Sequence, residues 1–247
     1  MQYNTSQTPE CERRFQLVVF DWDGTLMDSE GQIVSAMQAS IDDLGLAARS
    51  VADCRNIIGL GLQEAVDALY PGNDADFRKR FVERYRHHWF AGQHRSQLFP
   101  GARATLERLR AAGYQLAIAT GKGRLGLDRI LAETGLERLF DATRCSDETR
   151  SKPHPQMLHE LFEELDCTAA HAVMVGDTEF DMVMAASAGA GAVAVSYGVH
   201  ERERLLRHRP LACLDAIEQL QGWLGLAPAD PTTACAQRRE TTESGFG

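Results

Sequence analysis

The sequence predicts an α/β fold in which helices cover both faces of a parallel sheet and a small helical unit is inserted after the first strand. Short apolar segments alternate with helical segments along most of the chain, as in proteins built on parallel sheets. Residues 29–97 interrupt this alternation with helical periodicity and no convincing strand. The 247 residues are 44% hydrophobic and 25% charged, which is typical of a globular chain that buries a full core.

The first predicted strand is Leu17–Phe20, an apolar run that stops abruptly at Asp21. Similar short segments follow it along the chain, at residues 115–119, 142–145, 172–175, 192–196 and 211–214. Helical segments separate them, at residues 102–112, 125–134, 155–165, 180–188, 201–208 and 216–224. This order predicts parallel strands joined by helical crossovers.

The inserted unit shows two helical stripes. The first consists of Val34, Met37, Ile41 and Leu44, and the second of the aromatic residues Phe77, Phe81, Tyr85 and Trp89. Such a stripe is typical of a helix packed into a core. The segment Phe99-Pro100-Gly101 marks the return to the sheet. We therefore expect a core of residues 15–28 and 98–226, a helical unit of 29–97, and flexible tails of 1–14 and 227–247.

Charge and cysteine usage restrict the class of partner and the compartment. The formal net charge of -9 argues against nucleic acid, which is bound by clustered Lys and Arg. The six cysteines form no CxxC pair or zinc pattern, and scattered cysteines are typical of a reducing compartment. No signal-like stretch opens the chain, and its longest weakly polar run, Gly189–Val199, is too short to span a bilayer. We expect a cytoplasmic protein that does not bind membranes.

Two carboxylates follow the first predicted strand directly, in the segment Asp21-Trp22-Asp23-Gly24-Thr25. Ligands of open parallel sheets bind beyond the carboxyl ends of the strands, where these carboxylates would lie. Gly24 would let the backbone turn sharply and bring its amides near an anion. The other interpretation is a polar turn, because Asp and Gly favour turns.

A second acidic pair, Asp177 and Asp181, follows the predicted strand at 172–175. The two residues are four apart, so they share a face if the turn runs into a helix. Oxygen-rich clusters of this kind suit Mg²⁺, which takes one or two protein carboxylates together with water and phosphate oxygens. Acidic residues also favour a helix N-terminus without any metal.

Two further signals lie near the ends of other predicted strands. Thr120 and Gly121 directly follow the strand predicted at 115–119. A hydroxyl and free amides at this place could hold a phosphate oxygen, or the hydroxyl could cap a helix. Lys152 precedes Pro153 and is either a solvated charge or the cation of the same site. All four signals fall at one edge of the predicted sheet. Together they supply a nucleophile, a second acid, a hydroxyl, a cation and a metal site, the set that phosphoryl transfer requires.

These motifs, in this order from about Phe15 to Leu226, resemble those of the haloacid dehalogenase-like (HAD) superfamily and, within it, of the phosphoglycolate phosphatase-like branch. Residues 20–26 look like the first motif, Thr120 the second, Lys152 the third, and residues 176–181 the fourth. The resemblance implies a Rossmann-like three-layer core with a parallel sheet, and it makes residues 29–97 a small helical cap domain.

The resemblance also implies the roles of the two acids after the first strand. Asp21 would attack phosphorus and become an aspartyl phosphate. Asp23 would protonate the leaving alcohol and then deprotonate the water that cleaves the intermediate. Mg²⁺ would be held by Asp21, the backbone carbonyl of Asp23 and Asp177, with Asp181 acting directly or through a water. Thr120 and Lys152 would bind the phosphoryl oxygens.

Substrate choice is expected in the cap, because the motifs handle only the phosphate. The turn at residues 58–62 resembles the family's cap loop that faces the active site. Arg55 could bind a substrate carboxylate or be an ordinary surface arginine. Lys122 lies close enough to Thr120 in sequence to touch substrate, and Gly24 and Gly121 would offer backbone amides. Gly121 departs from the related sequences, where Asn is common, and this bears on which substrate is bound.

The implied activity is Mg²⁺-dependent hydrolysis of a small phosphorylated metabolite such as 2-phosphoglycolate, by a monomer or homodimer. Two alternatives stay open: a sugar phosphomutase with the same motifs, and a non-catalytic phosphate-binding module. Dehalogenation is disfavoured because the dehalogenases of the family lack an acid at the position of Asp23. Phosphonate cleavage is disfavoured because the related enzyme forms a Schiff base with a lysine of its cap. The only lysine in residues 29–98 here is Lys79, which lies in a charged run typical of a solvated helix face.

Overall fold

The computed structural model describes residues 13–92 and 96–227. Its main sheet has six parallel strands in the order β5-β4-β1-β6-β7-β8. The strands are β1 (Leu17–Phe20), β4 (Gln115–Thr120), β5 (Ala142–Cys145), β6 (Ala172–Gly176), β7 (Gly191–Val195) and β8 (Ala212–Leu214). The predicted parallel sheet is therefore confirmed, with each strand within two residues of its expected bounds.

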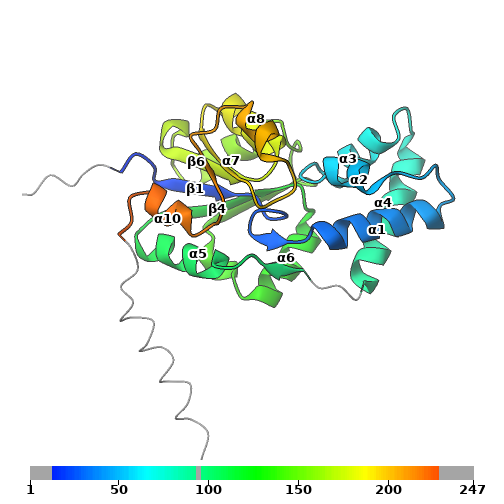
Figure 1. Cartoon of the computed structure of the whole chain (residues 1–247), viewed down its shortest axis with the longest axis horizontal. Coiled ribbons are helices and arrows are strands. Elements are labelled where there is room, and N and C mark those ends of the chain that lie inside the picture. Colours follow the sequence, from blue (N-terminus) through cyan, green and yellow to red (C-terminus); the bar gives the residue numbers. More distant parts are fainter. Residues whose placement is uncertain (1–12, 93–95, 228–247) are drawn as a thin grey trace, which may run out of the picture.

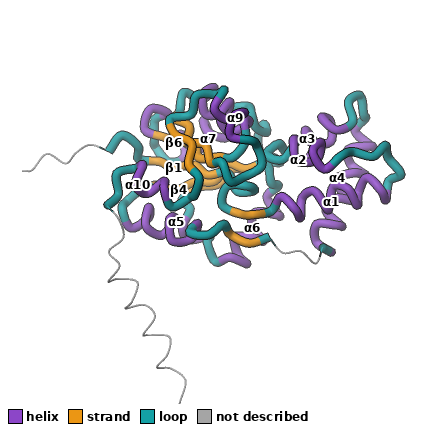
Figure 2. The backbone as a smooth tube through the Cα atoms, in the orientation of Figure 1, coloured by secondary structure: helices purple, strands orange, loops and turns teal. Residues whose placement is uncertain are grey.

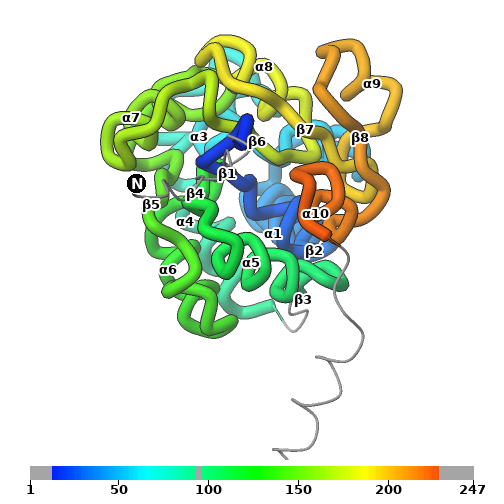
Figure 3. The backbone as a smooth tube through the Cα atoms, turned by 90° about the vertical axis from the view of Figure 1, so that its left-hand side faces the viewer, coloured from blue at the N-terminus to red at the C-terminus, as the bar shows by residue number. Residues whose placement is uncertain are grey.

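Helices cover both faces of this sheet, as Figure 3 shows in a view of β1 with helices above and below it. One face carries α5 (Ala102–Ala111), α6 (Arg124–Thr134) and α10 (Gln219–Trp223), and the other carries α7 (Gln156–Glu164) and α8 (Glu179–Ala188). The short helix α9 (Arg202–Leu206) packs on β7 and α8. Two 3₁₀ turns, Glu137–Leu139 and Ala169–His171, precede β5 and β6.

The two hydrophobic layers follow from the alternation of side chains along each strand. In β1, Val18 and Phe20 belong to the layer under α5 and α6, whereas Leu17 and Val19 belong to the layer under α7 and α8. All four side chains are completely buried. A strand buried on both faces needs apolar residues at every position, which explains why β1 has no polar alternation.

Four helices that lie between β1 and β4 in the sequence form a separate unit to one side of the sheet (Figure 1). They are α1 (Glu30–Asp43), α2 (Val51–Asn56), α3 (Leu62–Leu69) and α4 (Ala75–Ala91). The unit has its own hydrophobic cluster, which includes Met37, Ile41 and Phe81. The two predicted stripes thus lie on α1 and α4, which pack against each other, except that Leu44 caps the end of α1.

A two-stranded antiparallel ribbon joins this helical unit to the sheet. It consists of β2 (Met27–Asp28) and β3 (Gln97–Leu98), seen as the short orange segments beside the helical unit in Figure 2. The sequence predicted chain connections near these positions but no strands there, because two-residue strands carry no readable alternation. The expected tails, apart from residues 13, 14 and 227, lie outside the described residues.

The strand order explains where a site can form. From β1 the chain continues to β4 on one side, and β6 pairs with β1 on the other, so the order reverses at β1. Phe20 lies in register with Ile118 of β4 and with Val175 of β6. The residues that follow these three strands therefore meet at one edge of the sheet. In the described part of the chain, no helix is both long and apolar enough to cross a membrane.

Candidate active site

Asp21 is held at the end of β1 by the sheet itself. Its backbone amide donates a hydrogen bond of 2.9 Å to the carbonyl of Val175, which extends the pairing with β6 by one residue. Its Oδ1 accepts the amide of Trp22 at 2.7 Å, and its side chain is only 1% exposed. The chain then turns tightly, with Gly24 at φ +84° donating to the carbonyl of Met27 at 2.8 Å.

Gly24 is required by close packing as well as by its backbone angle. A Cβ atom at this position would lie 2.1 Å from Oδ2 of Asp177, well inside van der Waals contact. The turn after β1 therefore presses directly against the carboxylate that follows β6. Thr25, in the same turn, donates its hydroxyl to Oδ1 of Asp177 at 2.7 Å. These contacts fix the two acidic motifs relative to each other.

Three buried carboxylates form a cluster around one buried cation. Oxygen atoms of Asp21, Asp177 and Asp181 all lie within 4.8 Å of one another. The ammonium group of Lys152 lies 2.7 Å from Oδ1 of Asp21 and 2.6 Å from Oδ1 of Asp181. All four residues are at most 1% exposed. The structure thus brings together four of the residues that the sequence predicted for the site.

Asp181 stabilises the N-terminus of α8 through a capping box. Its Oδ2 accepts the backbone amide and the hydroxyl of Thr178, at 3.0 and 2.7 Å, so the two residues form a capping box. With Oδ1 on Lys152, both of its oxygens already have partners. The helix-capping and functional interpretations of this residue are therefore compatible, and its main contact in the site is with Lys152.

The electrostatics of the cluster reflect its burial. Burial raises the pKa of Asp21 well above its ordinary value; Lys152 opposes this shift, and the neighbouring Asp181 and Asp177 add to it. Burial and the neighbouring Asp181 raise the pKa of Asp177 to about 7. Burial lowers the pKa of Lys152, but Asp181 and Asp21 outweigh it and the net shift is upward. The cluster holds more negative charge than its single lysine balances.

The donor set fits a divalent cation. When ionised, the three carboxylates exceed the charge of Lys152 by two units, and hard oxygen ligands are what Mg²⁺ prefers. Oδ2 of Asp21 is buried and has no hydrogen-bond partner among the described residues. Both oxygens of Asp177 accept hydrogen bonds from neutral donors, one from the hydroxyl of Thr25 and the other from the amide of Val199 at 2.8 Å. Because Asp181 is paired with the cation of Lys152 and Asp177 is not, Asp21 and Asp177 are the residues best placed to bind such an ion.

Asp23 points away from this cluster and towards a cavity. Its Oδ1 accepts the hydroxyl of Ser29 at 2.6 Å, and its Oδ2 pairs with Nζ of Lys122 at 3.0 Å. The ammonium group of Lys122 also lies 4.3 Å from the ring centroid of Trp89. The Asp23 carboxylate thus stands apart from the metal-type cluster. The expected metal contact through its backbone carbonyl stays a prediction.

The loop after β4 forms the floor of the same cavity. Thr120 is completely buried, and its hydroxyl accepts the amide of Lys122 at 3.1 Å. A Cβ atom on Gly121 would lie 2.4 Å from the carbonyl oxygen of Leu60 and 2.6 Å from that of Gly59. Gly121 is therefore one position at which the predicted cap loop contacts the core. An Asn there would clash with this backbone.

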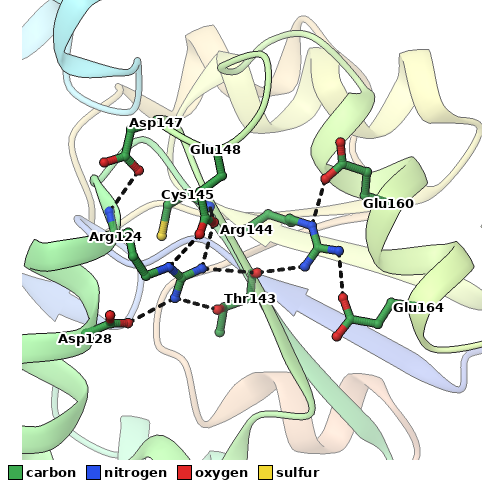
Figure 4. A network of polar contacts seen from close by, with 9 residues as sticks. All are labelled: Arg124, Asp128, Thr143, Arg144, Cys145, Asp147, Glu148, Glu160 and Glu164. Carbon is green, nitrogen blue, oxygen red and sulfur yellow. Dashed lines mark hydrogen bonds and ion pairs between the residues drawn. The ribbon is translucent and has the colours of Figure 1, made fainter.

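A polar network anchors the wall beside this loop (Figure 4). The guanidinium of Arg124 bonds Glu148 at 2.8 and 2.7 Å, and the Arg124 amide donates to Asp147 at 2.9 Å. The hydroxyl of Ser146 donates to the carbonyl of Gly121 at 2.7 Å. These contacts tie the turn after β5 to the loop after β4. They hold the wall rigid, because the arginine fork fixes direction as well as distance.

The cavity lies between the helical unit and the sheet edge and has a volume of about 310 Å³. Asp21, Asp23, Thr120, Gly121 and Lys122 line its inner end. The apolar part of the remaining wall comes from α1, the α2–α3 segment, α4 and α6, with Ile33, Met37, Ile57, Ile58, Leu60, Leu62, Val82, Tyr85, Trp89, Phe90 and Leu125. Its polar part consists of Gln63, Glu64, Arg86, Ser146 and Asp147.

Arg55 is not among the residues that line the cavity. Its Nε lies 2.8 Å from Glu30, and its terminal nitrogen donates to the carbonyl of Val199 at 3.3 Å. It therefore joins α2 to α1 and to the loop after β7. Neither contact faces the cavity, and its assignment to a substrate carboxylate stays a prediction.

Several residues of the site carry no sequence signal of their own. Ser29 and Ser151 are single serines, and the cavity side chains of α4 belong to a stripe that predicts only a packed helix. Thr25 stands in the first motif, and its contact with Asp177 could have been anticipated from the meeting of the two strand ends. The Ser151 hydroxyl accepts the amide of Gly61, and no spacing rule indicates that contact.

The chain is similar to known proteins along most of its length. The family described as haloacid dehalogenase-like hydrolase matches residues 18–195. The chain is 34% identical to "Probable phosphatase IndB" of Dickeya dadantii over 211 residues, covering 83% of this chain and 92% of that protein. It is 30% identical to a phosphoglycolate phosphatase of Aliivibrio fischeri over 221 residues, covering 86% and 97%.

Solved structures show the same fold. A haloacid dehalogenase-like hydrolase from Bacteroides fragilis superposes with a TM-score of 0.77 at 24% identity, covering 83% of this chain and 99% of that one. The crystal structure of "a predicted phosphoglycolate phosphatase" from Haemophilus somnus superposes with a TM-score of 0.74 at 25% identity, covering 85% and 98%.

Proposed function

The chain belongs to the haloacid dehalogenase-like hydrolases and is a phosphatase-type enzyme of that family; from this premise we propose that it is a Mg²⁺-dependent phosphatase that hydrolyses a small organic phosphate monoester through an aspartyl-phosphate intermediate on Asp21. The relatives named phosphoglycolate phosphatase support a small phosphate monoester as the class of substrate. One observation carries the proposal: Asp21 combines an unpartnered buried oxygen with a place at the inner end of a cavity.

Asp21 is the nucleophile of this mechanism. Its Oδ1 is held by Lys152 and by the amide of Trp22, whereas its Oδ2 has no hydrogen-bond partner in the described chain. A carboxylate fixed through one oxygen is oriented for attack or for metal binding through the other. Bound Mg²⁺ would supply charge neutralisation between the carboxylate and the phosphoryl group, which otherwise repel each other. Asp21 and Asp177 would hold it.

Asp23 is the general acid and base. Its carboxylate lines the cavity two residues after Asp21 and is oriented by Ser29 and Lys122, at 2.6 and 3.0 Å. From there it donates a proton to the leaving alcohol and afterwards takes one from the attacking water. Such proton transfer contributes about 10²–10⁴ in rate.

Thr120, Lys152 and nearby backbone amides bind the phosphoryl oxygens. Lys152 already contacts Asp21, so its charge lies close to the phosphorus that Asp21 attacks. The Thr120 hydroxyl lies at the cavity floor, and the Gly121 amide is a further donor, whereas the Gly24 amide already donates to the carbonyl of Met27. Phosphoryl transfer depends mostly on such positioning and charge stabilisation.

We propose that residues 29–97 act as the cap of this site. The Leu60 and Gly59 carbonyls abut Gly121, and Ser151 accepts the Gly61 amide at 2.6 Å, which supports a closed arrangement of cap and core. Closure excludes bulk water from the intermediate, and opening at the β2–β3 ribbon releases product.

The test is phosphate release from a panel of small phosphate esters, with and without Mg²⁺. We expect Mg²⁺-dependent release that Asp21→Asn abolishes, while Asp42→Asn, an exposed acid of α1, keeps full activity. Acid-stable trapping of the phosphoenzyme should label Asp21. Transfer of the phosphoryl group to a second hydroxyl instead of water would identify a phosphomutase, and magnesium binding without turnover would identify a binding module.

A further inference from the structure

We propose that the alcohol part of the substrate is uncharged and largely apolar, of about the size of a single ring, and that it is not a small carboxylate such as glycolate. The inference rests on the proposed phosphatase activity, because it names the class of ester bound at the same site. It follows from the walls of the cavity and from the pairing of the cations around it.

The part of the cavity wall that α1 and α4 contribute is mainly apolar. Met37 of α1 and Val82, Tyr85 and Trp89 of α4 contribute side chains, and Leu60 closes the wall beside Gly121. Tyr85 and Trp89 have nearly parallel rings, with centroids 6.0 Å apart and an interplanar angle of 22°. Ligand cavities start at about 300 Å³, so one of 310 Å³ holds the ester of a ring-sized alcohol.

The cations near the cavity have partners already. Lys122 pairs with Asp23 at 3.0 Å and lies over the Trp89 ring, and Lys152 lies within the carboxylate cluster. Arg55 pairs with Glu30 outside the lining. Among the described lining residues, the remaining cation is Arg86, which is exposed on the outer rim of the cavity.

A carboxylate on the alcohol would therefore be poorly matched. Against the apolar wall it would lose its hydration without gaining a buried partner, which is strongly unfavourable. At the rim, an exposed pair with Arg86 is worth little. The lining also contains the acidic residues Glu64 and Asp147, which would repel it. An uncharged apolar group gains free energy from the same wall, because its surface leaves water.

A matched series of esters tests this inference. We would measure kcat/KM with Mg²⁺ for phosphoglycolate, for 2-hydroxyethyl phosphate, which has the same size without the carboxylate, and for benzyl phosphate. We expect benzyl phosphate to exceed phosphoglycolate about tenfold or more, since each added apolar group in a fitted pocket contributes at least that factor. The opposite order, with phosphoglycolate well above 2-hydroxyethyl phosphate, would overturn the inference.

A substitution in the wall gives a second test. Val82→Arg places a cation on the α4 side of the cavity, and His87→Arg adds the same charge at an exposed position of α4 outside the lining. We expect Val82→Arg to raise the ratio of kcat/KM for phosphoglycolate over benzyl phosphate about tenfold, and His87→Arg to leave it unchanged. An unchanged ratio in a folded Val82→Arg protein would count against the proposed wall.

A binding measurement separates this inference from the proposed activity. Benzylphosphonate and phosphonoacetate are uncleavable probes of the two classes, and calorimetry with Mg²⁺ gives their dissociation constants on the unaltered chain. If no ester is hydrolysed but benzylphosphonate binds more tightly, the phosphatase proposal fails and the inference on ligand class stands. If phosphonoacetate binds more tightly, the inference fails whatever the activity.

Discussion

The hydroxyl of Ser151 accepts a hydrogen bond of 2.6 Å from the backbone amide of Gly61, across the junction between the sheet and the helical unit. Ser151 directly precedes Lys152 in sequence and is buried, with 6% of its surface exposed. One short segment of the core therefore contacts both the cluster of buried carboxylates and the loop at residues 58–62. The position of that loop is thereby linked to the segment that carries Lys152.

Ser151→Ala should weaken the seating of this loop. The Gly61 amide would lose its acceptor, and an unsatisfied buried donor costs about 1–3 kcal/mol unless the loop opens to water. We expect kcat/KM to fall by about tenfold and hydrogen exchange at Gly61 to become faster. Ser187→Ala, at an exposed position of α8, is the matched control and should change neither. Unchanged exchange at Gly61 would mean that the hydrogen bond does not hold the loop.

Gly121→Ala tests the close approach of the helical unit to the sheet edge. Its Cβ atom would meet the Leu60 carbonyl at 2.4 Å, so the loop at residues 58–62 has to move outwards. We expect kcat/KM to drop by roughly tenfold or more, because small displacements of positioning groups cost large factors in rate. Gly222→Ala is the control, since a Cβ atom there meets nothing within 4 Å. Wild-type activity in Gly121→Ala would show that closure tolerates a wider gap.

Lys152→Met should destabilise the protein by about 3–5 kcal/mol near neutral pH, because it removes the one cation that is buried among three carboxylates. Urea unfolding, with its midpoint and slope, measures the change. Mg²⁺ should restore part of the stability, and adding Asp181→Asn should restore another part. Lys79→Met, at an exposed position of α4, controls for loss of a lysine and should unfold like the unaltered chain.

Stability without metal should depend on pH through Asp177 and, in the same direction, through Asp21, whose pKa burial also raises. The pKa of Asp177 is raised to about 7, first by burial and then by Asp181, against about 3.9 in the unfolded chain. Between these values the folded state holds a proton that the unfolded chain has released. Stability therefore falls as the pH rises from about 4 to 7, by up to about 1.4 kcal/mol per unit. Stabilisation by Mg²⁺ should accordingly grow with pH, measured as the shift in Tm.

The shift caused by Mg²⁺ is the appropriate readout because His200 acts in the opposite direction. Burial, followed by the charge of Arg204, lowers its pKa to about 4, so between there and about 6.5 the unfolded chain binds the extra proton and stability rises with pH. Asp177→Asn should reduce the Mg²⁺ shift at every pH, because it removes a proposed ligand, and leave the His200 contribution in place. A Tm shift that is equal at about pH 5 and about pH 8 would contradict the assignment.

The strands and helices of the core could be predicted from the sequence because each is short, strongly patterned and bounded by turn residues. Leu17–Phe20 and Ala142–Cys145 match their predicted bounds. The β2–β3 ribbon could not be predicted, since its pairing depends on where the helical unit leaves and returns. The short helix α10 begins three residues later than predicted, at Gln219, because the segment before it forms turns.

The acidic motifs were recognisable because carboxylates after buried strands are rare without a role. The cavity wall was not recognisable, because Phe81 and Tyr85 lie on one stripe of α4 and period alone does not separate them. Phe81 is completely buried in the core of the helical unit, whereas Tyr85 lines the cavity. Phe81 and Tyr85 lie on successive turns of α4. Which of these two side chains faces the cavity depends on how the helical unit packs against the sheet, and that is a property of the tertiary structure.

The ribbon of β2 and β3 also has a consequence for the history and redesign of this enzyme. Met27 pairs with Leu98, and Asp28 with Gln97, so the chain departs and returns at neighbouring strands, roughly 5 Å apart. A helical module whose two ends lie at that spacing can replace residues 29–96 at these two points, and the strand order and connections of the six-stranded sheet stay the same. Recombination, natural or in the laboratory, can thus exchange the module while the machinery at the sheet edge is inherited unchanged.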